Sequence, residues 1–190
     1  VKESELHCVS CHTSSGRYRF KSDDLITANK ACTSCHTEKE EFYEMHTHHK
    51  IAEAGSPKCI DCHMPLTMFG HMNRSDHSFR PPMPKATIEF GSPNACNMCH
   101  EDQSAEWSQK QLLKWKKDKG YQEKTLAAAR LIVQAREGNW KNINSILDAV
   151  KNDTYGEVFT TSLLRLLATH NDPNKSCLLY TSDAADDLLC

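Results

Sequence analysis

The sequence is poor in aromatic residues and has no long apolar run. Aromatic side chains make up 7% of its 190 residues, and hydrophobic residues make up 38%. This composition predicts a thin side-chain core, above all toward the N-terminus. No apolar stretch approaches the length that a membrane-spanning helix needs. An excess of positive charge is also missing: the formal net charge of −2 argues against binding driven by nucleic-acid phosphates.

Cysteine and histidine, by contrast, are abundant, with ten and eleven residues. Eight of the cysteines form four Cys-x-x-Cys pairs, and a histidine follows each pair at once. In c-type haem attachment, two thiols with this spacing add across the haem vinyl groups, and the next histidine binds the iron from one side. The pattern therefore predicts four covalent c-type haems, whose macrocycles would add apolar surface. The attachment residues would be Cys8, Cys11, Cys32, Cys35, Cys59, Cys62, Cys96 and Cys99, and the proximal ligands His12, His36, His63 and His100.

Two other interpretations of the cysteine pairs are open. Structural zinc sites also use Cys-x-x-Cys pairs, but a four-cysteine site does not require a histidine after every second cysteine. A disulfide framework would use paired cysteines in a secreted chain, and it too leaves the four histidines unexplained. The repeated histidine therefore favours haem over both alternatives.

Four proximal ligands leave seven of the eleven histidines. Haems with an electron-transfer role would use up to four of these as distal ligands. A helix is predicted over roughly residues 38–54, with Phe42, Met45, His46 and His49 on one face and His48 turned away. We therefore expect His46 and His49 to be distal ligands, with Phe42 and Met45 excluding water from that face.

His77 and His7 are the other two expected distal ligands. His77 lies in a short link between the third and fourth motifs, just before three prolines that limit its reach. His7 adjoins Cys8 and could bind a neighbouring haem, because its own haem is held by His12. Of the remainder, His48 and His71 are reserves that would otherwise lie on the surface, and His170 is expected as a cation at a helix end. Met45, Met64 or Met72 are less expected as ligands than as residues packed on haem edges.

All four motifs lie within residues 1–102, and the predicted fold class is mainly α. We expect a tetrahaem cytochrome c domain over 1–102, with little regular structure around stacked haems and a non-helical stretch at residues 80–84. Residues 103–176 are expected to be an α-helical, HEAT-like repeat segment. Its first helix would be capped by Ser104 and stop at Gly120; further helices would cover about 122–136, 140–151 (capped by Asn139) and 156–169.

The two ends of the chain differ from a natural, complete sequence in what they suggest. Residues 177–190, CLLYTSDAADDLLC, resemble a translated sequencing adapter, and we expect them to be an artefact that takes no part in the fold. The alternative is a genuine tail closed by a Cys177–Cys190 disulfide. At the other end, the start at Val1 is what a processed protein or a fragment would show.

Three stretches, CIDCHMP, RSDHSFRPPMP and SPNACNMCHEDQSAEW, carry a family resemblance. The sequence resembles multihaem c-type cytochromes in which HEAT- or TPR-like helical repeats follow the motifs, and it is similar to tetrahaem cytochromes that pair with hydroxylamine oxidation. The resemblance covers about residues 1–117. It implies periplasmic or extracellular electron transfer in a prokaryote, with His77 and His46 or His49 as distal ligands; it lends no support to His7 or His71.

The sequence is compatible with three functions. An electron carrier, with both axial positions of its haems filled, would exchange single electrons with redox partner proteins as donor and acceptor. A redox enzyme acting on nitrogen oxides or hydroxylamine would need one five-coordinate haem and a nearby acid or base. A subunit of an extracellular cytochrome filament, or another homo-oligomer, would pass electrons between protomers. Abundant spare histidines favour the carrier, which has no catalytic residues, no nucleic-acid partner and no transmembrane segment.

Overall fold

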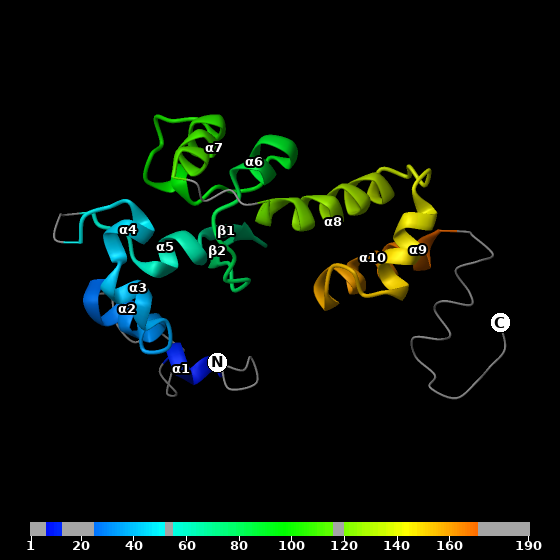
Figure 1. Ribbon diagram of the computed structural model, residues 1–190. Helices are drawn as coiled ribbons and strands as arrows, with labels where there is room; N and C mark the ends of the chain where they lie inside the picture. The colour runs from blue at the N-terminus through cyan, green and yellow to red at the C-terminus, as the bar shows by residue number, and fades with distance from the viewer. Residues whose placement is uncertain (1–6, 13–24, 52–54, 116–119, 171–190) are drawn as a thin grey trace. The chain divides into compact units, whose positions relative to one another are not determined.

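The computed structural model describes residues 7–12, 25–51, 55–115 and 120–170 (Figure 1). Within these ranges the chain is mainly helical with two short strands, which confirms the predicted class. It divides into two compact units, residues 1–111 and 112–190. The expected boundary after residue 102 precedes α7 (Ala105–Lys114), whereas the boundary between the two units falls inside that helix. The 177–190 tail, including its cysteines, lies outside the described residues.

Each Cys-x-x-Cys-His motif sits on about one turn of helix. The first and third motifs form α1 (Cys8–Cys11) and α5 (Cys59–His63), the second begins near the end of α2 (Leu25–Thr33), and the fourth forms a 3-10 helix, η2 (Cys96–Met98). In the first, second and fourth motifs the histidine N–H donates to the carbonyl of the first cysteine, at 2.9, 3.0 and 2.9 Å. Residues i, i+3 and i+4 share one side of a helical turn, so both thiols and the imidazole project together.

The single helix predicted over 38–54 is wrong. Two short helices, α3 (Thr37–Glu41) and α4 (Tyr43–Thr47), are separated by Phe42, and His48 ends the second with a left-handed φ of 60°. A left-handed residue after the last turn is a common helix terminator. The Thr47 hydroxyl then accepts the N–H of His49 at 3.1 Å, in place of a helical hydrogen bond.

The link between the third and fourth motifs contains elements that the sequence did not predict. Strands β1 (Leu66–Phe69) and β2 (Met72–Ser75) form an antiparallel hairpin in which Phe69 pairs with Met72. Its turn, Gly70 and His71, has φ of 53° and 64°, as a two-residue hairpin turn of the primed type requires. The stretch before Pro84 is non-helical as expected, but Pro84 itself is the first residue of α6 (Pro84–Phe90), a position that suits proline.

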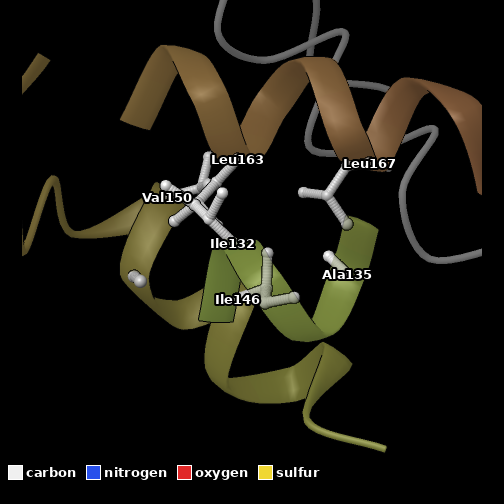
Figure 2. Close-up of a cluster of buried hydrophobic side chains, with 7 residues drawn as sticks. Ile132, Ala135, Ile146, Val150, Leu163 and Leu167 are labelled. Atoms are coloured by element: carbon white, nitrogen blue, oxygen red, sulfur yellow. The ribbon is translucent and has the colours of Figure 1, made fainter. Parts of the chain in front are cut away.

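The second unit contains the helices predicted from periodicity. They are α8 (Tyr121–Arg136), α9 (Ile143–Lys151) and α10 (Glu157–Thr169). Figure 2 shows Leu163 and Leu167 of α10 pointing at side chains of α8 and α9, and both leucines are fully buried. The unit therefore has a side-chain core larger than that among the described residues of the first unit, with these further buried members: Ile132, Ala135, Ile146, Ala149 and Val150.

The predicted helix ends are right in part. Ser104 caps α7, since its hydroxyl accepts the N–H of Trp107 at 3.2 Å. That helix ends at Lys114, and Gly120, with φ of 77°, precedes α8 as its N-cap instead of stopping the helix before it. Likewise α9 begins after Asn142, so Asn139 does not cap it.

Candidate functional site

None of the eight motif cysteines is in a disulfide. Burial raises the pKa of the Cys62 thiol to about 12, and burial also raises the pKa of Cys96. Both therefore stay protonated near neutral pH. This leaves both sulfurs as neutral thiols, the group that adds to a vinyl carbon in c-type attachment.

Three motif histidines each face one histidine from elsewhere in the first unit. The ring centres of His46 and His63 are 6.2 Å apart, and the two rings are within 4° of parallel. The ring centres of His12 and His77 are also 6.2 Å apart, and the angle between the ring planes is 26°. In the third pair, His49 and His100, the ring centres are 6.1 Å apart and the angle between the planes is 37°. Each pair thus joins a predicted proximal ligand to a predicted distal one.

The spacing within these pairs is too wide for direct stacking and suits a shared metal. Trp140 and His170, which stack directly in the second unit, have ring centres only 4.1 Å apart. A ring nitrogen binds a metal at about 2 Å, and the ring centre lies about 1 Å further out, so two axial rings have centres about 6 Å apart. The three distances of 6.1–6.2 Å match this value. The residues present therefore fit haem iron held between two imidazoles.

Two of the facing histidines are oriented by nearby carbonyls. Nδ1 of His49 lies 2.7 Å from the Thr47 carbonyl oxygen, and Nδ1 of His77 lies 2.8 Å from that of Ser75. A ring that donates Nδ1–H to a carbonyl keeps its lone pair on Nε2, the tautomer of most metal-bound histidines. The left-handed turn at His48 and the end of β2 therefore present Nε2 of each ring as a ligand.

His63 is prepared in the same way from the proximal side. The Phe79 and Arg80 carbonyls accept hydrogen bonds from its ring, and burial holds its pKa below the ordinary value. The neutral ring is the form that binds a metal. Phe79 also lies edge-on to His77, with ring centres 6.2 Å apart, so the Asp-His-Ser-Phe stretch touches two of the three pairs.

The other predicted ligands are placed differently. His36 is exposed, and among the described residues, which include every histidine of the chain, no ring pair contains it. His7 is exposed at the N-cap of α1, and His71 is exposed in the hairpin turn. His48 forms the left-handed end of α4. Phe42 and Met45 are also exposed, so the expected apolar packing around His46 is not made by protein contacts.

One residue beside the site was not singled out from the sequence. Trp107 of α7 lies against His100, with ring centres 4.9 Å apart. Ser104, which caps α7, fixes the start of the helix that carries the indole. The sequence feature that could have identified Trp107 as a residue of the site is its position at the end of the SPNACNMCHEDQSAEW stretch, seven residues after the motif histidine.

Two further features bear on the alternatives. Across residues 7–12, 25–51, 55–115 and 120–170, no three histidine, cysteine or acidic side chains are grouped as a bare metal ion would require. In the same residues, no helix combines the length and the apolar character needed to cross a membrane.

Helical-turn Cys-x-x-Cys-His motifs and facing histidines together define the class of c-type cytochromes. The family model for cytochrome c552 matches residues 41–161, more than half of the chain. The chain therefore belongs to the cytochrome c552 family, which supports a multihaem c-type cytochrome with covalently bound haem. The matched region contains the third and fourth motifs, all three facing histidines, and α8 and α9. Searches of curated proteins and of solved structures gave no match.

Proposed function

We propose that this protein is an electron carrier that holds four c-type haems through its eight motif cysteines. His12, His36, His63 and His100 bind the irons from the proximal side. His77, His46 and His49 complete the coordination of the first, third and fourth haems. A haem between two imidazoles supplies a one-electron ferric/ferrous couple without an open position for substrate.

The observation that carries this proposal is the set of three histidine pairs at 6.1–6.2 Å. Every pair combines one motif histidine with one histidine that has no cysteines before it. A chance meeting of imidazoles would not select this combination three times. The carbonyls that hold Nδ1 of His49 and His77 support the same assignment, because they leave Nε2 for the iron.

Periplasmic or extracellular redox proteins are the proposed partners. The cytochrome c552 family supports this compartment and this kind of partner. The helices α8, α9 and α10 would serve as a docking module for such partners. Their internal core supports this role, because it makes the module a folded element that needs no haem of its own.

A second candidate function is a redox enzyme with one five-coordinate haem. The specific observation in its favour is the exposed His36, which no described ring pair contains. If the haem of the second motif has no distal ligand, its iron would have one open face, where a nitrogen oxide or hydroxylamine could bind. Some members of the same family are nitrite reductases, which is consistent with this second candidate. His7 remains the proposed distal ligand if the site is closed.

One set of measurements on the purified protein tests both candidates. A pyridine haemochrome assay should give close to four c-type haems per chain, and acid-acetone should extract none. Fewer than four haems, or bound zinc, would overturn the proposal. Carbon monoxide added to the ferrous protein then separates the two functions: no binding supports the carrier, and binding at one haem supports the enzyme.

A further inference from the structure

The second and third attachment motifs meet where α2 contacts α5, a contact that we call the seam, although the motifs lie on different helices. Helix α2, which carries Cys32, packs against α5, which carries Cys59. The Asn29 side-chain oxygen accepts the backbone N–H of Cys59, and Asn29 lies about one helical turn before Cys32 on α2. The first cysteines of the two motifs therefore flank the same residue, and so would their thioether sulfurs.

Asn29 holds this seam together. Its side-chain oxygen accepts the backbone N–H of Cys59 at 2.9 Å, and its side chain is only 7% exposed. That N–H belongs to the first residue of α5, where no helical acceptor exists, so Asn29 supplies a cap from another element. Asn29 also lies three residues before Cys32 on α2, and thus on the same side of that helix.

The surroundings of the seam are buried on both sides. Thr33, the residue after Cys32, is 4% exposed. On the third-motif side, Tyr43 is also buried, and its hydroxyl donates to the Pro57 carbonyl, just before α5. A buried amide held by a hydrogen bond costs more to disturb than an exposed one, because the partner N–H would be left without an acceptor.

We propose that Asn29 is a positioning residue that locks the second and third haem-attachment sites into one structural unit. This rests on the proposed function, since it presumes that both motifs carry haem. Asn29 fixes the start of α5 against α2, and so keeps the Cys32 and Cys59 sulfurs adjacent. The two attachment sites then cannot shift independently. A charge placed at residue 29 should therefore act on both haems at once.

Potentiometry of an Asn29→Asp variant tests this. The aspartate keeps an oxygen for the Cys59 N–H and adds a negative charge that favours the ferric form of a nearby haem. The titration is done at pH 9, because burial raises the pKa of a carboxyl group. We expect four haems per chain, with two of the four midpoint potentials lowered and two unchanged. Asn73→Asp, the same change at an exposed position of β2, is the matched control and should move none comparably.

A shift of one potential only, or an equal shift of all four, would overturn the proposal. A second variant covers the case in which Asn29→Asp does not accumulate. Asn29→Leu removes the acceptor, and peptide mass mapping should show reduced haem attachment at both Cys32–Cys35 and Cys59–Cys62, with the other two motifs fully loaded. Loss at a single motif, or at all four, would count against Asn29. A wild-type protein with fewer than four haems would instead refute the proposed function.

Discussion

At the scale of the residue, hydrogen bonds to the backbone determine which imidazole nitrogen could bind a metal. His49 and His77 both face a carbonyl two positions earlier in the chain, at 2.7 and 2.8 Å. Neither contact depends on a haem, so the rings are held in a ligating tautomer by local structure alone. For a ring that is an iron ligand, this preparation would reduce the entropy lost on binding.

Replacing any one proposed distal ligand should open one haem and leave the other three unchanged. In His46→Ala, His49→Ala and His77→Ala, the iron opposite His63, His100 and His12 respectively loses its sixth ligand. We expect one haem per variant to become high-spin in the electron paramagnetic resonance spectrum and to bind carbon monoxide once reduced.

His48→Gly is the control for this series. Glycine adopts the left-handed φ of 60° at that position without strain, so the end of α4 is preserved. Its spectrum should match that of the wild type. If His48→Gly instead opened a haem while His46→Ala did not, the pairing of His46 with His63 would be wrong.

At the scale of the element, the two units obtain their stability in different ways. The second unit has a core of aliphatic side chains from three helices, whereas large apolar side chains of the first unit, such as Met68 and Phe79, are exposed. Covalent haem is the apolar surface proposed for the first unit. The stability of the two units should therefore respond to different substitutions.

Leu163→Ala should destabilise the helical unit by about 2–5 kcal/mol, because it removes a fully buried leucine from the contact between α10 and α8. Circular dichroism during thermal unfolding would show an earlier loss of helix. The haem absorption spectrum at 25 °C should not change. Val158→Ala is the control on the same helix, since Val158 is 72% exposed and should be nearly neutral. A Leu163→Ala protein with altered haem ligation would show that the helices support the haem sites directly.

At the scale of the whole molecule, charge governs the encounter with partners. The polypeptide has a formal net charge of −2, and four haems would add about two propionates each, so the loaded protein is more acidic than its sequence. An acidic protein attracts cationic partners, and 0.1 M salt largely screens that attraction beyond about 10 Å. Complementary charge acts mainly on the rate of association.

Electron transfer to a cationic oxidant should therefore slow as ionic strength rises, whereas transfer to an anionic oxidant of similar potential should accelerate. Stopped-flow measurement with a cationic cobalt complex and with ferricyanide, between 10 and 500 mM salt, compares the two. Equal salt dependence for both oxidants would mean that electron transfer occurs at a neutral patch, and the reverse order would mean a positive patch; either result would contradict the prediction.

Much of the fold could be predicted because its signals are local. The helices α8, α9 and α10 follow from apolar periodicity, and Ser104 was recognisable as a cap from its position before an amphipathic segment. The hairpin over Leu66–Ser75 could not be predicted in the same way, because both strands are short and their pairing depends on a left-handed turn at Gly70 and His71. The end of α4 at Thr47 was missed for a related reason, since the periodicity of residues 38–54 continues past the left-handed His48.

The sequence by itself determined the attachment chemistry, because a Cys-x-x-Cys-His motif acts within five consecutive residues, where one helical turn sets the geometry. It also narrowed the proposed distal ligands to a few histidines. Only the tertiary structure decided which of them faces which motif: His46 meets His63, His49 meets His100, and His77 meets the distant His12. Those pairings, like the hydrogen bond from the Cys59 N–H to the Asn29 side chain, join residues that are far apart in the chain. No local pattern encodes them, because they depend on how the loops between the motifs close and on which helices pack together.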